Sequence, residues 1–216
     1  REGREGEDFL QTLMDSRYAD GRPLTDDEIT GMLIAAMFAG HHTSSVTTSW
    51  ALVELLRNWN YLDRVVAQID RVLPGGTQVS MQTLRELTLA EYAVKETLRL
   101  HPPLFMLIRV AQEDWQYQDY FVPKGSWIVV SPTVSHKSRR YFQHPDRFDP
   151  DRFSPRRIEE MDDWSFIPFG GGRHKCLGNA FAILQVKTIL GILLGRYEFE
   201  LSGDPIEDDF QSMVIG

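Results

Sequence analysis

The chain has 216 residues, of which 42% are apolar and 25% are charged, a composition typical of a folded globular protein rather than a disordered tail. Its net charge of -8 argues against a general nucleic-acid-binding protein, because such proteins gain most of their affinity by neutralising phosphates with Lys and Arg. A single cysteine, Cys176, excludes an intrachain disulfide and any zinc site built from cysteine pairs. The longest apolar run, Met32 to Ala39, is too short to span a bilayer.

The first two-fifths of the chain predict helices. Thr25 followed by Glu28 forms a capping-box pattern at the start of a proline-free helix expected over 26–57. The middle of this helix is unusual because the polar run from Gly40 to Ser45 interrupts an apolar stretch. Such a centre lowers helix propensity, which makes this segment a candidate functional site.

Proline, glycine and apolar periodicity divide the rest of the chain into shorter elements. The expected helices cover 61–73, a short turn after Ser80, 90–100 and 177–194. The expected strands cover 115–122 and 126–130, joined as a hairpin by the turn Pro123–Gly125, with two further strand-like pieces at 197–201 and 213–215. Between them, 131–169 is expected to be irregular. The predicted fold class is therefore mainly α with a minor β region.

The strongest chemical signal is the loop from Phe169 to Gly178, with the sequence FGGGRHKCLG. Its glycines let the backbone pass close to a flat ligand. The helix expected directly after Cys176 turns its N-terminal amides toward the sulfur, and the basic residues 173–175 precede the thiol, so both features favour a thiolate. Taken alone, a lone cysteine after a glycine loop is more often a buried structural thiol.

This loop resembles the haem-ligand loop of the cytochrome P450 family, whose pattern is Phe-Gly-x-Gly-x-Arg/His-x-Cys-x-Gly. The resemblance implies that Cys176 is the proximal ligand to the iron of haem b, that Phe169 packs beside the sulfur, and that His174 binds a haem propionate. The remaining matched positions are Gly170, Gly172 and Gly178. The resemblance also implies that 1–216 is the C-terminal, haem-binding part of one cytochrome P450 domain, which needs the N-terminal half of the same fold as its partner.

A second motif, Glu96-Thr97-Leu98-Arg99, lies on the helix expected over 90–100. By itself, a Glu and an Arg three positions apart form an ordinary surface ion pair. The family, however, places Glu-x-x-Arg on this helix and completes a network with a later arginine, which Arg152 matches. The resemblance therefore implies a Glu96–Arg99–Arg152 cluster with an architectural role.

The polar centre of the long helix resembles the oxygen-activation site of the same family. There, a small residue and a glycine make room above the iron, and Thr43 matches the threonine that follows. His42 stands where the family usually has an acid, a departure that resembles the sterol 14α-demethylase branch. Thr43 and His42 are therefore the candidate catalytic residues, and a pair of ordinary helix histidines at His41 and His42 is the alternative.

The resemblance extends to the substrate cavity. Arg109 matches a propionate-binding arginine of that branch, with a solvated arginine as the alternative. The residues expected to line the cavity come from the long helix, from the segment after Pro103 and from the C-terminal turn: Phe38, Ala39, His42, Leu104, Met106, Leu107, Met213 and Val214.

The implied activity is oxidative removal of the 14α-methyl group of a sterol, with O2 and electrons from a donor such as a ferredoxin or a reductase. Two alternatives stay open: a haem-thiolate hydroxylase acting on another lipid, and a haem-binding or structural remnant without turnover. A bacterial protein of this kind is expected in the cytoplasm, and an N-terminal segment outside this chain is the expected route to any membrane association.

The basic charge of the chain gathers around the cysteine loop, where 137–187 contains ten Lys or Arg and seven Asp or Glu. A positive surface on an acidic molecule favours steering of an acidic electron donor, and solvated surface arginines are the alternative. The residues expected to form this surface are Arg173, Lys175, Lys187, Arg139 and Arg140.

Overall fold

The computed structural model describes residues 8–74, 79–158, 164–203 and 206–209. Two of the expected cavity residues, Met213 and Val214, and the strand-like piece at 213–215 lie outside these ranges. Within the described ranges, no helix is both long enough and apolar enough to cross a membrane. The chain divides into two compact units, Arg1–His42 and Thr43–Gly216.

The first unit contains α1 (Phe9–Asp15) and the beginning of α2 (Asp26–Arg57), the helix that continues into the second unit. Both halves of the expected capping box form at the start of α2. The Thr25 N–H donates to the Glu28 carboxylate at 2.8 Å, and the Glu28 N–H donates to the Thr25 hydroxyl at 3.3 Å. Hydrogen bonds from Arg22 and from the Thr25 backbone lower the pKa of Glu28 to about 2.

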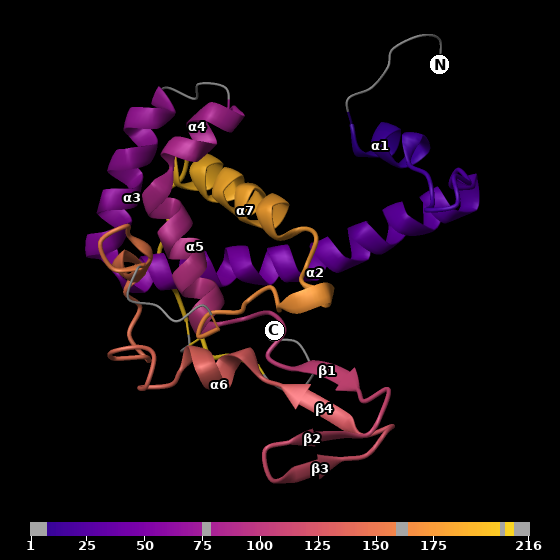
Figure 1. Ribbon diagram of the computed structural model, residues 1–216. Helices are drawn as coiled ribbons and strands as arrows, with labels where there is room; N and C mark the ends of the chain where they lie inside the picture. Colours follow the sequence, from indigo (N-terminus) through magenta and orange to yellow (C-terminus); the bar gives the residue numbers. More distant parts are fainter. Residues whose placement is uncertain (1–7, 75–78, 159–163, 204–205, 210–216) are drawn as a thin grey trace, which may run out of the picture. The chain divides into compact units, whose positions relative to one another are not determined.

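The core of the second unit is helical. Figure 1 shows α3 (Trp59–Val72), α5 (Thr88–Leu100) and α7 (Asn179–Leu194) packed together, with the short α4 (Met81–Glu86) beside α7. Buried apolar residues recur on α3 at helical spacing, so that helix presents one continuous apolar stripe. The fully buried members of the core include Leu55, Val65, Leu87, Val94 and Leu190.

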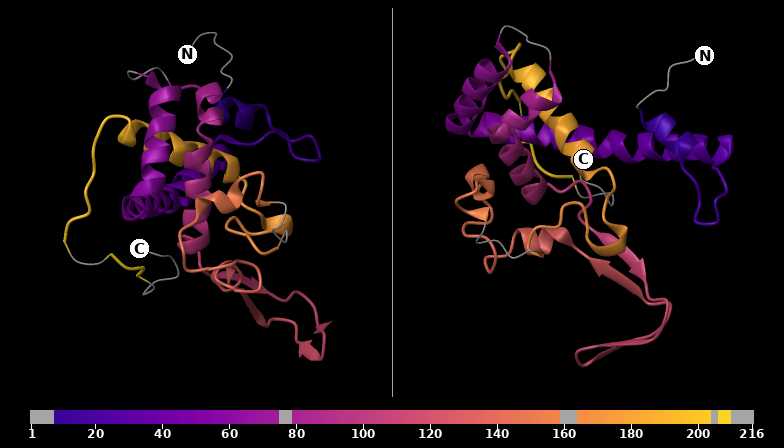
Figure 2. Two further views of the ribbon diagram at one scale, coloured as in Figure 1. Left: turned by 90° about the vertical axis from the view of Figure 1, so that its left-hand side faces the viewer. Right: turned by 45° about the horizontal axis from the view of Figure 1, so that its top comes forward.

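The β region consists of two antiparallel pairs. Strand β1 (Leu107–Val110) pairs with β4 (Trp127–Val130), and β2 (Trp115–Tyr117) pairs with β3 (Tyr120–Val122). Figure 2 shows the second pair as a hairpin continuing from the first. The expected hairpin between 115–122 and 126–130 is therefore wrong. The chain reverses earlier, where Gln118 adopts a φ of +51°, and a glutamine there gives no sequence signal for a turn.

The segment expected to be irregular contains short helices, including α6 (Pro132–His136) and the 3-10 helix η2 (Pro150–Phe153), which packs against α5. The residues 197–201, expected as a strand, have no regular structure, because none of the described strands pairs with them. The mainly α fold with a minor β region is confirmed.

Candidate functional site

The loop from Phe169 to Gly178 presents Cys176 at the surface of the second unit. The Cys176 N–H donates to the Phe169 carbonyl at 2.9 Å and closes the loop. Gly170 and Gly172 have φ values of +69° and +66°, a region that residues with a Cβ rarely adopt. The backbone at these two of the three matched positions therefore favours glycine.

Helix α7 begins at Asn179 and not at Leu177, so the prediction that it starts directly after the thiol is wrong by two residues. The reason is that Gly178 takes the N-cap position, with its carbonyl accepting the Ala182 N–H at 2.8 Å. A Cβ on Gly178 would lie 3.9 Å from the Cys176 sulfur. A small residue there leaves the sulfur accessible.

The inner side of the loop packs on the protein. Phe169 is partly buried against the hydrophobic core. Leu107 of β1 approaches Gly170, since its Cδ1 atom would lie 3.6 Å from a Cβ at that position. Gly171 is an additional constrained position, because a Cβ there would lie 2.7 Å from the Trp164 ring. The family pattern leaves that position open, so only the structure identifies it.

The basic residues around the loop separate into two groups. Arg173, His174 and Lys175 are exposed, the first two within the 3-10 helix η4 (Gly172–His174). Lys187 is 1% exposed and pairs with Glu91 at 2.9 Å, so its assignment to an exposed basic surface is wrong. Its position on α7 faces the helical core, which the local charge pattern does not reveal.

A cavity of about 760 Å³ adjoins the loop and brings in residues that sequence reasoning missed. Lys175 lines it together with Arg85 of α4 and Lys95 of α5, beside apolar groups such as Trp164 and Met81. Arg85 and Lys95 lie far from Cys176 in the sequence, and helical spacing alone gives them no functional meaning.

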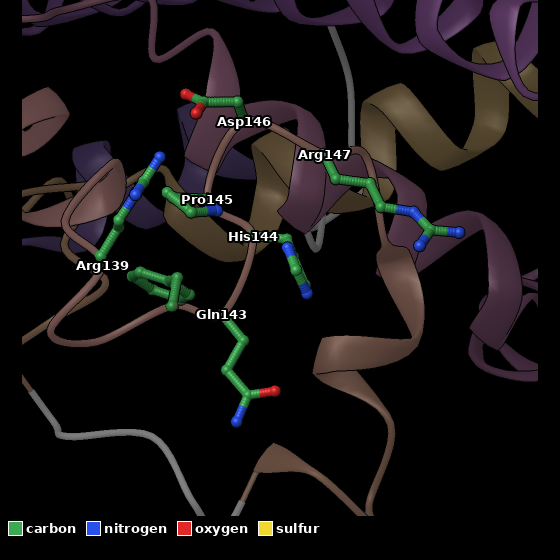
Figure 3. Close-up of a pocket in the computed structure, with 7 residues that line it drawn as sticks. Arg139, Gln143, His144, Pro145, Asp146 and Arg147 are labelled. Atoms are coloured by element: carbon green, nitrogen blue, oxygen red, sulfur yellow. The ribbon is translucent and has the colours of Figure 1, made fainter.

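The other two arginines expected on the basic surface lie at a separate place. Arg139 lines a second cavity of about 680 Å³, formed by residues 139–147, and Arg140 is exposed beside it. In Figure 3, the Arg139 and Arg147 side chains lie on opposite sides of this pocket. They do not converge on one point, so the pocket has no single focus of positive charge.

The structure brings Glu96, Arg99 and Arg152 together in a buried cluster. Arg99 donates to both Glu96 carboxylate oxygens at 2.8 Å, and Arg152 donates to one of them at 3.2 Å. The side chains of Glu96 and Arg99 are 0% exposed and that of Arg152 is 5% exposed. The charges are therefore paired away from water, as a buried carboxylate requires.

The same cluster holds the irregular segment that leads to the cysteine loop. Arg99 donates to the backbone carbonyls of His136, Pro145 and Arg147 at 2.8, 2.6 and 3.1 Å. Arg152 adds a hydrogen bond to the His144 carbonyl at 2.9 Å. Carbonyls at the end of α6 and in the irregular chain after it thus obtain hydrogen-bond partners.

The polar centre of α2 crosses from one unit to the next. Phe38, Ala39 and His42 are exposed at the end of the first unit, and Phe38 is 80% exposed. Thr43 is half-buried at the start of the second unit, and its carbonyl accepts the Thr47 hydroxyl at 2.7 Å.

Ser44, the hydroxyl residue that follows Thr43, is buried. It donates to the Gln185 side chain at 3.1 Å, so this hydroxyl run reaches α7, the helix that follows Cys176.

The candidate residues after α5 lie on and before β1. Leu104 is exposed, while Met106 and Leu107 are half-buried. Arg109 is exposed and donates to the neighbouring Ile108 carbonyl at 2.8 Å. Leu107 approaches the cysteine loop at Gly170.

His101, the residue directly after α5, is a buried histidine that contacts the C-terminal half of α2. The sequence did not single it out. The ring of His101 stacks on Trp50 with centroids 4.0 Å apart, and its nitrogens face Glu54 at 3.3 Å and Asp208 within hydrogen-bond distance. Burial lowers the pKa of His101, but the hydrogen bonds to Asp208 and Glu54 outweigh it and raise the pKa above its usual 6.5. This cluster ties α2 to residues near the C-terminus.

The donor set around Cys176 fits a haem better than a bare metal ion. In the described part of the chain, no group of three or more His, Cys, Asp or Glu could hold a metal ion. A porphyrin supplies four nitrogen ligands itself and needs one protein ligand, which an exposed thiol provides. The apolar side chains of Leu177 and Phe181, 101% and 69% exposed, and the basic Arg173 and His174 suit a flat apolar ring with acidic substituents.

The chain matches the sequence profile of the cytochrome P450 family over residues 1–216. It is 44% identical over 212 residues to a sterol 14alpha-demethylase of Mycolicibacterium vanbaalenii, covering 96% of this chain and 47% of that protein. It is 42% identical over 222 residues to an obtusifoliol 14-alpha demethylase of Sorghum bicolor, covering 99% and 45%.

A crystal structure of the cytochrome P450DA heme domain aligns with a TM-score of 0.89 and 25% identity, covering 96% of this chain and 47% of that one. The chain thus spans about half the length of the curated relatives it matches.

Proposed function

Because the chain belongs to the cytochrome P450 family, we propose that the complete protein is a haem-thiolate monooxygenase in which Cys176 ligates the iron. The main support for the proposal is the exposed thiol at the end of the glycine loop. The backbone hydrogen bond from the Cys176 N–H to the Phe169 carbonyl fixes this loop. Haem b would supply the activation of O2, and a thiolate ligand favours O–O cleavage.

The residues of the chain have separate tasks in this proposal. His174 and Arg109 neutralise the haem propionates, since both are exposed basic groups on segments near the cysteine loop. The Thr43 hydroxyl would hold a proton at its Oγ1 atom, and His42 would pass protons inward from solvent. Support for these last two roles comes from their polar character in the middle of an apolar helix.

The proposed substrate is a sterol that carries a 14α-methyl group. Relatives from a bacterium, a plant and a mammal share this reaction in their names, at 44%, 42% and 41% identity. His42 before Thr43 agrees with that branch of the family. Hydroxylation of another lipid is the second candidate, and a remnant without turnover is the third.

The proposed electron donor is an acidic protein such as a ferredoxin or the acidic domain of a reductase. Lys175 and Arg85 line the 760 Å³ cavity and, with the exposed Arg173, form the proposed basic surface. Lys95 also lines the cavity, but it pairs with Glu91 at 2.7 Å. The steering effect of this surface should weaken as added salt screens the charges. The cytoplasmic location expected for a bacterial protein stays a prediction, which cell fractionation would test.

The test is turnover by the complete protein with a 14α-methyl sterol, O2 and a reduced ferredoxin. The proposal expects a demethylated sterol and formate in equal amounts. A hydroxylated product that keeps its methyl carbon would favour the second candidate. Haem binding with no product from sterols or other lipids would favour the third.

A further inference from the structure

We infer that His136 is a positioning residue that fixes the start of the cysteine loop by accepting the backbone N–H of Ile167. The inference rests on the proposed ligation of haem by Cys176. His136 is the last residue of α6 and its side chain is fully buried. Its Nε2 atom accepts the Ile167 N–H at 3.0 Å, and its ring lies beside Phe166 with centroids 5.2 Å apart.

The hydrogen bond selects one form of the imidazole. An Nε2 atom that accepts an N–H carries no proton, so the proton of the neutral ring is on Nδ1. Protonation of the ring would place an N–H at Nε2, directly facing the Ile167 N–H, and the hydrogen bond would be lost. Nδ1 is buried and has no hydrogen-bond partner among the described residues, so the ring is held through Nε2 and through packing.

The surroundings of the ring disfavour its charged form. Burial, followed by the positive charge of Arg99, lowers the pKa of His136 to about 4. Arg99 of α5 is the charged group that faces His136, since its guanidinium donates to the His136 carbonyl at 2.8 Å. Phe166 and Ile167, the contacts on the other side, carry no charge. At neutral pH His136 is therefore a permanent acceptor.

A short chain of backbone hydrogen bonds connects this acceptor to the thiol. The Ile167 carbonyl accepts the Gly170 N–H at 3.0 Å, and the Phe169 carbonyl accepts the Cys176 N–H at 2.9 Å. Both backbone groups of Ile167 are thus held, because its N–H donates to His136 and its carbonyl accepts the Gly170 N–H. Through His136, the buried cluster of Glu96 and Arg99 connects to the loop as well as to the irregular segment.

The test compares His136→Gln, whose amide oxygen can replace Nε2 as acceptor, with His136→Leu, which has no acceptor. The control is Val65→Ala, a fully buried position on α3 outside this network. Two quantities are measured in the complete protein at neutral pH. They are hydrogen exchange at the Ile167 amide, and the fraction of haem whose reduced, CO-bound form has the strongly red-shifted absorption band of thiolate ligation.

We expect His136→Leu to accelerate exchange at Ile167 by about tenfold or more, since a buried hydrogen bond is lost, and to lower the thiolate-ligated fraction. His136→Gln should keep both quantities near wild type, and Val65→Ala should lower thermal stability alone. Unchanged exchange in His136→Leu, or a glutamine variant as impaired as the leucine variant, would overturn the inference.

A second measurement covers the case in which His136→Leu does not fold. Exchange at Ile167, normalised to the intrinsic rate, should accelerate in wild type as the pH falls toward 4 and stay flat in His136→Gln. Equal profiles would overturn the inference. If the wild-type protein lacks the thiolate band, the proposed function fails, whereas the exchange data still decide the role of the His136 hydrogen bond.

Discussion

Replacing Arg99 by methionine is expected to lower the free energy of unfolding by about 3–5 kcal/mol, the usual cost of removing one partner from a buried ion pair. Arg99 and Glu96 are both 0% exposed, so the substitution leaves a carboxylate that water cannot reach, with Arg152 at 3.2 Å as its remaining charged partner. Three backbone carbonyls, those of His136, Pro145 and Arg147, lose a donor at the same time. The loss is a large share of the total stability of a typical domain.

The control for Arg99→Met is the exposed pair of Arg64 and Asp151. These side chains form two hydrogen bonds of 2.9 and 3.0 Å, a geometry comparable to that of Arg99 and Glu96, but they are 48% and 40% exposed. Arg64→Met should therefore cost only about 0–1 kcal/mol. The two sites differ in burial and in the three backbone carbonyls that Arg99 also holds.

Both variants are compared by urea unfolding of the complete protein, with the midpoint and slope of the transition measured for each. Arg99→Lys is included because lysine keeps the charge but loses the planar fork that reaches five acceptors. We expect it to fall close to Arg99→Met. Equal losses in Arg99→Met and Arg64→Met, or a loss below about 1 kcal/mol in the first, would refute the architectural role.

Three further predictions concern other parts of the second unit. The raised pKa of His101 contributes stability that is fully present below about pH 6.5 and is lost as the pH rises through the pKa of the folded protein. Unfolding curves measured across pH should show this loss of stability in wild type. The same loss in His101→Gln would contradict a role for His101. Gly171→Ala should displace the exposed Trp164 ring and cost no more than about 1 kcal/mol, with a smaller cost in a Trp164→Ala background. Equal costs in both backgrounds would exclude the contact. Thr43→Ala should keep haem content but divert electrons from product into hydrogen peroxide, whereas a variant that stays fully coupled would rule out a role for this hydroxyl in proton delivery.

Local signals in the sequence predicted the elements that depend on local chemistry. The capping box of Thr25 and Glu28 located the start of α2, because both of its hydrogen bonds connect residues three positions apart. The hairpin was wrong because the reversal at Gln118 uses a residue that carries no turn signal. Strand pairing between β1 and β4 depends on residues about twenty positions apart, which periodicity does not encode.

The candidate site shows the same division. The loop around Cys176 was identified from a short run of residues, and the resemblance supplied its chemistry. The burial of Lys187 and the approach of Lys95 to the loop depend on how α5 and α7 pack, so a linear charge pattern placed the first residue wrongly and missed the second. His136 was missed because its partner, Ile167, is 31 residues away.

Ligation of haem iron by the Cys176 thiolate is tested by the absorption spectrum of the reduced, CO-bound complete protein. Wild type and Lys175→Ala, a neighbouring change that leaves the thiol in place, should both show a main band shifted strongly to the red. Cys176→Ser should lose this band while the rest of the fold persists. A red-shifted band that survives in Cys176→Ser would contradict the claim.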